Sequence, residues 1–314
     1  FSSDVTSFQL EETSAGAGPS LLREVKIGEK DYIVTSSKLA NTTKDGWVQV
    51  PMAALALSLI YPVKREALPG AAALSIDTTN LLGIYVGELT TWTDAVPNGW
   101  FYMAVPDPSA PITFYVQHYE DEASEFASTQ GLLGRALCNL TSNGEHIPNA
   151  DVFCAAYRSN GNRLIPTLEQ FNPGRVVALP IGTTPLELIG SLANSTAGLA
   201  LSTVSAGVAH DLLSIQIESI AGFLTEDQLN QAVPGVGAVV AGESLAIDIL
   251  NSKAGWPFSA LQFVSVPRES VVRGCAYLQS VADFLVWSHT NNMAIDLITQ
   301  APHYAVLNNG IRSI

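Results

Sequence analysis

The sequence has few charged residues, and basic ones are particularly scarce. Only 14% of the 314 residues are charged, and 29 acidic against 15 basic side chains leave a formal net charge of -14 at pH 7. Nucleic acids and anionic membranes are bound through clusters of Lys and Arg. The composition therefore argues against a nucleic-acid partner. It also opposes uptake of a small anion, unless a local positive field overrides it.

The sequence also lacks an apolar run long enough to span a bilayer. The longest, residues 52–61 between two prolines, is half of the roughly 20 residues that a spanning helix needs. We therefore predict no membrane span, and we expect this run to form a buried strand or a strand that crosses between two lobes. Apolar residues make up 47% of the chain and no segment is of low complexity, which is typical of a globular protein. The chain starts at Phe1 without an initiator Met or a signal-peptide pattern, as expected of a processed product.

Motifs of enzymes and metal proteins are missing as well. The five histidines show neither an i, i+4 pair nor the Cys/His spacing of a metal site. No G-x-S-x-G elbow occurs, and no nucleophile is paired with a base. We predict that the protein is not an enzyme and that it holds no cofactor and no metal.

Only three cysteines are present. Cys138 and Cys154 bracket a polar segment, CNLTSNGEHIPNADVFC, which is typical of a local disulfide in an oxidising compartment. Such a disulfide would contribute about 3 kcal/mol in the chain-entropy model. Cys275 lies on an apolar helical pattern, so we expect a buried small residue there. The alternative, a catalytic thiol, would need a His and a carboxylate around it.

Three N-glycosylation sequons begin at Asn41, Asn139 and Asn194. Each alone can arise by chance. Together with the cysteine pair and the low charge, they favour a secreted eukaryotic glycoprotein, located outside the cell or on its surface. Asn139, inside the expected disulfide loop, is the best candidate for a glycan.

Hydrophobic patterning predicts strands that alternate with helices. The expected strands are residues 5–10, 32–35, 47–51, 100–105, 112–117, 176–181, 197–204 and 263–267. The expected helices are residues 21–25, 123–136, 184–192, 224–232, 243–251 and 269–289. This alternation indicates an α/β fold with helices on both faces of a mostly parallel sheet.

The most complete local signal lies in residues 74–94, LSIDTTNLLGIYVGELTTWTD. Asp77 is an N-cap residue type, and the apolar residues after it have the spacing of a short helix. Gly87 then predicts a left-handed C-cap. Trp92 anchors a compact turn that Asp94 can close through its side chain.

This segment resembles one in the second lobe of the phosphate-binding proteins of bacterial ABC transporters. The shared pattern is D-x-x-x-L-x-x-I-Y-x-G-x-L-x-x-W-x-D, and a second match is W-P-F-S at residues 256–259 with F-L-x-W at residues 284–287. The resemblance implies a two-lobed periplasmic-binding-protein-like fold of type II, in which each lobe is a mixed, mainly parallel sheet flanked by helices. Lobe 1 would be residues 1–62 plus 255–314, and lobe 2 residues 63–254.

The family opens with a Gly-rich strand and a helix that precede the strand expected at residues 5–10, and neither is found in this sequence. A missing strand leaves backbone groups unpaired on its neighbours. The gap would be filled by upstream residues on a separate piece or by a strand from a neighbouring protein chain.

The family's central anion-binding loop reads R-x-D-G-S-G-T-x-F, and the matching stretch here is HYEDEASEF, residues 118–126. The resemblance places His118 at the Arg, Glu120 at the Asp, Glu122 at the Ser and Ser124 at the Thr, while the two glycines become Asp121 and Ala123. The bidentate cation is lost and three carboxylates stand where an oxyanion would arrive. Two like charges about 4 Å apart repel by roughly 4 kcal/mol at an effective dielectric of 20. We therefore expect that phosphate is not bound at this loop.

Of the two other loops of the family's site, one is partly kept and one departs. Ser20 remains in the first helix turn, and Ser36 replaces the Asp of the second loop. Both could bind a neutral solute, although roles as an N-cap and a loop hydroxyl explain them more simply. The acidic turn is explained most simply as a cap for the following helix. A sharper hypothesis is that the carboxylate of Glu122 fills the vacated anion site from within.

Two functions follow from these residues. The first is an extracellular module with a degenerate anion site, acting as a structural or interaction subunit of a surface assembly with other protein chains. The second is a solute-binding protein for phosphate or another small ligand, which would use Ser20, Ser36, Ser124 and His118 in a cleft between the lobes.

Overall fold

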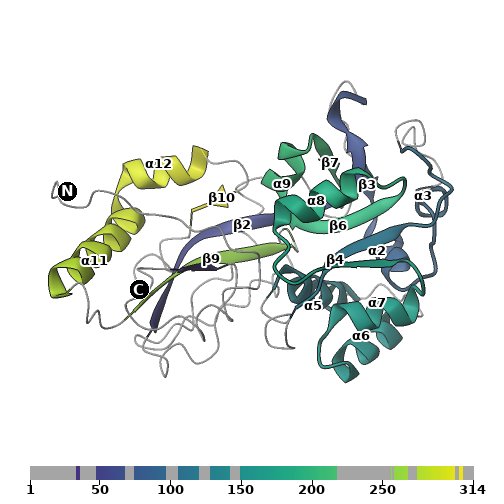
Figure 1. Ribbon diagram of the computed structural model, residues 1–314, viewed down its shortest axis with the longest axis horizontal. Helices are drawn as coiled ribbons and strands as arrows, with labels where there is room; N and C mark the ends of the chain where they lie inside the picture. Colours follow the sequence, from purple (N-terminus) through teal and green to yellow (C-terminus); the bar gives the residue numbers. More distant parts are fainter. Residues whose placement is uncertain are drawn as a thin grey trace.

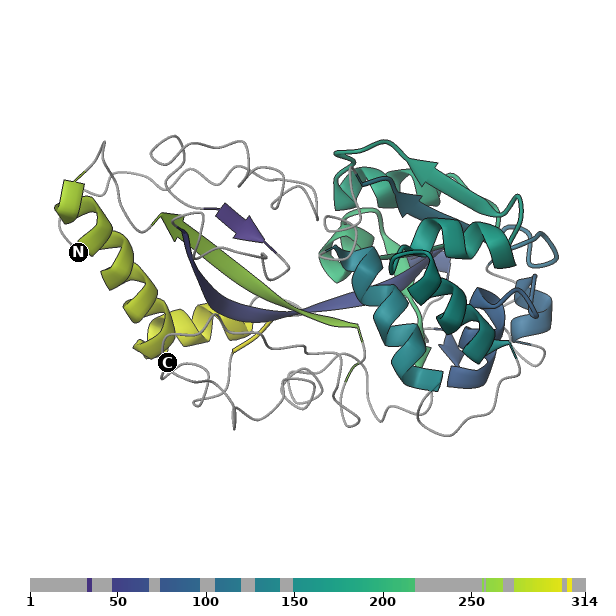
Figure 2. The same cartoon turned by 90° about the horizontal axis from the view of Figure 1, so that it is seen from below.

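The computed structural model describes residues 33–35, 47–67, 74–96, 105–119, 128–141, 149–217, 256, 258–267, 274–300 and 304–306. These residues form two lobes joined by two long strands, β2 (Trp47–Lys64) and β9 (Ser259–Pro267) (Figures 1 and 2). The first lobe holds β1 (Ile33–Thr35), β10 (Tyr304–Ala305), α11 (Gly274–Thr290) and α12 (Asn292–Gln300). The second lobe holds the remaining elements. The fold is therefore two-lobed and α/β, as expected.

The long strand β2 belongs to both lobes. Its residues 47–56 pair with β9, and residues 57–64 pair with β6 (Gly198–Thr203) and β7 (Leu212–Ser214). The apolar run at residues 52–61 is thus a strand that crosses between the lobes. A register shift between Pro51 and Ala53 accommodates the proline inside the strand. A division of the chain after residues 62 and 254 stays a prediction.

The crossing is fastened by the second segment of the family pattern. The indole N–H of Trp256 donates to the carbonyl oxygen of Leu57 at 2.7 Å, and the Leu57 N–H donates to the carbonyl of Phe258 at 2.7 Å. The Trp256 and Phe258 rings are fully buried and meet edge to face. These contacts hold β2 where it changes its pairing partner.

The main sheet has the strand order β1-β9-β2-β6-β4-β5, with β7 and β10 also paired to β2. β4 (Thr113–Gln117) is parallel to β5 (Val176–Leu179) and β6, whereas the pairs made by β2 and β9 are antiparallel. A short parallel pair joins β3 (Ser75–Ile76) to β8 (Gln216–Ile217). The sheet is mixed, as expected. Its described pairs are parallel only where β6, β4 and β5 lie side by side, whereas the pairs described in the first lobe are antiparallel and not mainly parallel as expected.

Helices cover both faces of the second lobe's sheet. One face packs against α2 (Thr78–Tyr85), α3 (Trp92–Ala95), α5 (Thr129–Thr141), α6 (Ala150–Ser159) and α7 (Leu164–Phe171), around buried Trp92, Tyr85 and Phe114. The other face packs Ile60 and Ala200 against α8 (Pro185–Ala193) and α9 (Val204–Ala209). A short 3-10 helix, η1 (Arg65–Ala67), follows β2. None of the described helices is both long enough and apolar enough to cross a bilayer.

The predictions for residues 74–94 are confirmed. Asp77 caps α2 by accepting the Asn80 N–H at 2.6 Å, and Gly87 adopts the left-handed conformation with φ +79°. Thr91 and Asp94 form a reciprocal capping box around α3. These caps depend on neighbouring residues alone, which is why the sequence reveals them.

The cysteine predictions have different outcomes. The disulfide between Cys138 and Cys154 is confirmed, and it joins α5 to α6. The end of the segment expected to be a polar loop, residues 150–154, belongs instead to α6, and neither α6 nor α7 was predicted. The prediction for Cys275 is wrong, because this residue is exposed in the first turn of α11. The strand expected at residues 5–10, most of the strand at 100–105 and the helices at 21–25, 224–232 and 243–251 lie outside the described residues.

Candidate functional site

The candidate site lies where β6, β4 and β5 end, an edge that we call the carboxyl edge. In open parallel sheets, ligands bind at this edge between neighbouring strands whose connections leave towards opposite sides. Here β4 connects through α5, α6 and α7 to β5, its neighbour on one side. β6 connects through α9 to β7, which pairs with β2 on the other side. The switch point therefore lies between β4 and β6.

His118 is the one predicted ligand residue that lies within the described part of the chain. It directly follows β4, and its backbone N–H donates to the carbonyl oxygen of Leu179 at 2.8 Å. Its side chain is exposed at the carboxyl edge. Ser20, Ser36, Glu122 and Ser124 lie outside the described residues, so their roles stay predictions.

No basic side chain stands in for the family's Arg in the described part of this edge. Residues 117–119, 128–130, 179–184 and 202–205 include no Lys and no Arg. Arg175 lies at the opposite end of β5, with its guanidinium 5.9 Å from the centre of the Phe114 ring. Burial lowers the pKa of Arg175, but the side chain also donates to Asn172 and to the Thr90 carbonyl. The charge of Arg175 thus supports the fold at the far edge.

Side-chain hydroxyl groups cap the helices that start at the carboxyl edge. Ser128 Oγ accepts the N–H groups of Gln130 at 3.1 Å and Gly131 at 3.3 Å at the start of α5. Thr184 and Thr203 cap α8 and α9 in the same way. Free N–H groups at a helix N-terminus are what phosphate sites use. At these helices, part of that capacity is taken by side chains.

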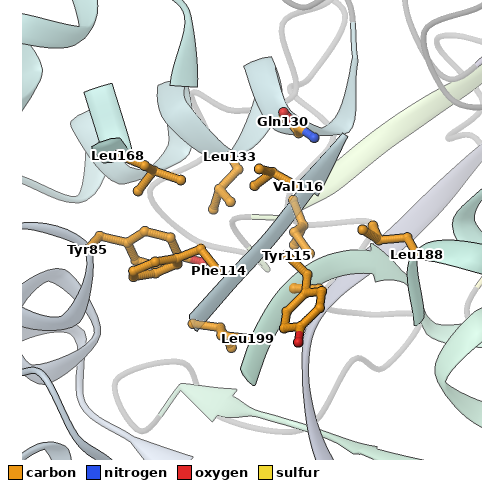
Figure 3. A pocket seen from close by; sticks show the side chains of 11 residues that line it. Tyr85, Phe114, Tyr115, Val116, Gln130, Leu133, Leu168, Leu188 and Leu199 are labelled. Carbon is orange, nitrogen blue, oxygen red and sulfur yellow. The ribbon is translucent and has the colours of Figure 1, made fainter. Parts of the chain in front are cut away.

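β4 and β6 separate as they approach the edge. Their ladder holds only Thr113 against Gly198 and Phe114 against Leu199, although β4 continues to Gln117 and β6 to Thr203. A cavity of about 10 Å³ lies along this divergence, large enough for one water-sized group (Figure 3). The described lining is mostly apolar, and Gln130 contributes the amide. The cavity is too small to hold a whole ligand.

Three buried polar side chains near this edge each have an oxygen without a hydrogen-bond partner among the residues described. Gln130 is 5% exposed, and its Oε1 has none. Ser58 and Ser202 face each other across β2 and β6, at 0% and 3% exposure, and neither hydroxyl oxygen has a partner among the residues described. Buried polar groups are almost always paired, so each such group calls for an explanation.

Sequence reasoning missed these three residues because an uncharged polar residue in an apolar pattern matches no functional motif. Ser58 lies inside the longest apolar run, and Gln130 directly precedes the apolar face of α5. The available signal was the interruption of the apolar pattern itself. Among the described residues, no group of three or more His, Cys, Asp or Glu side chains is placed to hold a metal ion.

The sequons occupy different positions. Asn41 lies outside the described residues, and Asn139 belongs to the last turn of α5 rather than to a loop. Asn194 is the exposed C-cap of α8, where its amide donates to the Gly190 carbonyl at 3.1 Å. Glycosylation of all three stays a prediction.

No protein-family model matches the sequence. One curated relative, R826 of Acanthamoeba polyphaga mimivirus, is named as a proposed serine/threonine-protein kinase/receptor and is 22% identical over 277 residues. This match covers 86% of the chain but only 15% of that protein. The chain thus corresponds to a small part of a much longer relative.

Solved structures of phosphate-binding proteins share the whole fold. PfluDING, a high-affinity periplasmic phosphate-binding protein in a structure bound with phosphate, superposes with a TM-score of 0.66 at 14% identity, over 99% of this chain and 88% of its own. A phosphate-binding protein from Stenotrophomonas maltophilia gives 0.64 at 15% identity, over 99% and 89%. The ancestral soluble variant of the human phosphate-binding protein gives 0.54 at 13% identity, over 96% and 84%. The chain has the two-lobed fold of the periplasmic phosphate-binding proteins.

Proposed function

We propose that the protein is an extracellular binding-protein-like module that has lost its phosphate site and acts as an interaction module of a larger surface protein or assembly. The observation that carries this proposal is the exposed His118 at the end of β4, in a described edge that contains neither Lys nor Arg. A phosphate-binding site needs a charge-assisted, preferably bidentate donor at this position. A single imidazole is a weaker substitute with a different geometry.

Two further features support the loss of phosphate binding. Ser128, Thr184 and Thr203 already accept the N–H groups that an oxyanion would use at three helix N-termini. In the sequence, Glu120, Asp121 and Glu122 add three carboxylates directly after His118. Each carboxylate repels an arriving anion, and the described edge offers no Lys or Arg to offset this repulsion.

The proposal includes no catalysis. The structural neighbours are named as binding proteins, and their likeness to this chain is one of fold. An altered solute-binding role is the second candidate. It is favoured by Gln130, Ser58 and Ser202, each of which has a buried oxygen near the carboxyl edge without a partner among the described residues.

A role within a larger protein fits the length relationship. The mimivirus relative is named as a kinase/receptor, and the match spans 15% of it, as a recognition module in a longer receptor would. The confirmed disulfide and the three sequons support a location outside the cell. Partner chains, including one that supplies a strand to the first lobe, belong to the same proposal.

Isothermal titration calorimetry with phosphate and sulfate tests the proposal. We expect no heat that corresponds to micromolar binding, whereas the Stenotrophomonas maltophilia phosphate-binding protein serves as a positive control. Clear micromolar binding of phosphate would contradict the loss of the site. Glu122→Gln separates the two explanations of the acidic turn: if the carboxylate fills the site from within, its neutralisation should increase phosphate affinity, whereas a simple helix cap should leave affinity unchanged.

A further inference from the structure

We propose that the gap between β4 and β6 receives the neutral hydroxyl or carboxamide group of a small solute, and that Gln130 is the side chain that recognises it. This inference rests on the proposed loss of phosphate binding and names the ligand class that replaces phosphate. The bulk of the solute would lie outside the gap, towards the exposed His118 at the carboxyl edge.

The gap is built into the pairing of the strands. β4 and β6 start as parallel neighbours, where the Thr113 N–H donates to the Ala197 carbonyl at 2.8 Å. Their ladder then ends after Phe114 and Leu199, while both strands continue. The cavity follows this divergence, lined on the two strands by Tyr115, Val116, Ala200 and Leu201. An entering group would therefore meet strand backbone as well as side chains.

Gln130 places an amide at this cavity. It is in the first turn of the 13-residue helix α5, where Ser128 holds its backbone N–H. Gln130 is only 5% exposed, and its Oε1 has no hydrogen-bond partner among the described residues. Figure 3 shows Gln130 beside Val116, near the end of β4. The described residues leave this acceptor unpaired.

The residue type argues against a purely structural role. Leu132 and Leu133 follow in α5 after Gly131, and both are buried in the main core. A Leu or Met at position 130 would fill similar space without leaving a polar atom unpaired. A carboxamide instead offers one acceptor and two donors, which matches a hydroxyl or another carboxamide.

Size and charge define the ligand class. A space of about 10 Å³ accepts one small group, and no charged residue stands among residues 117–119, 128–130 and 202–205 to neutralise an ion. Burial of an unpaired ion is unfavourable in such surroundings. A neutral solute that carries hydroxyl or carboxamide groups meets both conditions. A single water also fits, and the experiment separates it from a ligand.

The test combines thermal unfolding with calorimetry, using glycerol, myo-inositol and acetamide as probes. At least one probe should raise the melting temperature of the wild type in proportion to its occupancy. Gln130→Met should weaken that binding at least tenfold without lowering the melting temperature of the ligand-free protein. Gln170→Met, at an exposed position of α7, is the matched control and should respond as the wild type does. Gln130→Glu keeps the shape but adds charge, and should also abolish binding.

The failures of the two proposals differ. If no probe shifts the wild type, or if Gln130→Met binds the probe unchanged, this inference is overturned while the loss of phosphate binding stands. A crystal structure with only a water in the gap, in the presence of each probe, would overturn it as well. If phosphate binds with micromolar affinity, the proposed function fails instead.

Discussion

The two edges of the β6-β4-β5 sheet differ in how closely their segments pack, although a buried hydroxyl without a hydrogen-bond partner among the described residues, that of Ser195, also lies at the amino edge. At the amino edge, where these strands begin, segments far apart in sequence interlock. Gly87 lies so close to the Phe171 carbonyl that an added Cβ would collide with it. The Asn172 amide donates to the Tyr85 carbonyl at 2.7 Å, and Arg175 binds Asn172 and covers the Phe114 ring. Except for Ser195, each polar group named here has a partner that depends on the fold.

At the carboxyl edge, the strands separate and several buried polar atoms have no partner. Gln130, Ser58 and Ser202 each leave an oxygen unpaired there, and the described residues of this edge include no Lys and no Arg. The later part of the segment that resembles the phosphate-binding proteins, residues 85–94, lies at the amino edge. Of that segment, Tyr85 alone lines the cavity between β4 and β6, so most of the residues that specify the fold lie away from the proposed ligand site.

The largest expected effect comes from breaking the amino edge at Gly87. Gly87→Ala introduces a Cβ at φ +79° and against the Phe171 carbonyl, so we expect a loss of about 3–5 kcal/mol in the free energy of unfolding. Gly174 also has a positive φ, but an added Cβ would meet nothing within 4 Å. Gly174→Ala should therefore lose only about 1–2 kcal/mol. Urea denaturation measures both, and equal losses would show that the close approach contributes nothing.

The next largest effect concerns the disulfide that joins α5 to α6. Replacing Cys138 and Cys154 together by Ser should lower the free energy of unfolding by about 3 kcal/mol, because the unfolded chain regains the freedom of the closed loop. Cys275→Ser is the control, since this thiol is exposed and unpaired, and it should leave stability unchanged. Reduction of the wild type should reproduce the double variant. A stable reduced protein would limit the disulfide to a minor role.

Local signals of the amino edge could be predicted from the sequence, whereas the carboxyl edge could not. Asp77, Gly87 and Asp94 act on backbone groups within a few residues, so residue type and spacing suffice. The full length of β2 was missed because Pro51 normally ends a central strand, and only the bulge beside it permits one continuous strand. The exposure of Cys275 was missed because an apolar helical pattern does not reveal which side faces solvent at the first turn.

The candidate site required the structure for a physical reason. The divergence of β4 and β6 depends on how far two strands remain paired whose partners, such as Thr113 and Gly198, are 85 residues apart, which no local pattern encodes. Likewise, Ser58 and Ser202 become neighbours only through the register of β2 and β6. That His118 stands at the position of the family's Arg stays a prediction, which needs only a motif comparison.

A smaller effect, of opposite sign, is expected at the carboxyl edge. Replacing Ser58 and Ser202 together by Ala should stabilise the protein by about 1 kcal/mol, because two unpaired hydroxyls are removed from a buried position. Thr167 provides the contrast: its hydroxyl is fully buried, donates to the Arg163 carbonyl at 2.7 Å and accepts from Asn160. Thr167→Val should cost about 1 kcal/mol. If the double Ser variant loses stability instead, bound water satisfies the two hydroxyls.

The smallest expected effect compares one exposed carboxylate from each edge in acid. Asp107 precedes β4 at the amino edge, and hydrogen bonds from the Ser109 hydroxyl and from the Ser109 and Ala110 N–H groups lower its pKa. Glu187 belongs to the cap of α8 at the carboxyl edge, where the Thr184 N–H and hydroxyl lower its pKa. A carboxyl whose pKa is lower in the folded state stabilises the protein above its unfolded pKa of about 4, and this contribution is lost as the pH falls through the folded value. Melting temperatures between pH 6 and pH 2 should therefore fall less steeply for Asp107→Asn and for Glu187→Gln than for the wild type. If both variants reduce the pH dependence of the melting temperature equally, the cap of α8 at the carboxyl edge is as structural as the turn at the amino edge. If Glu187→Gln alone leaves the pH dependence unchanged, its cap is weak and the α8 N-terminus remains open to a ligand.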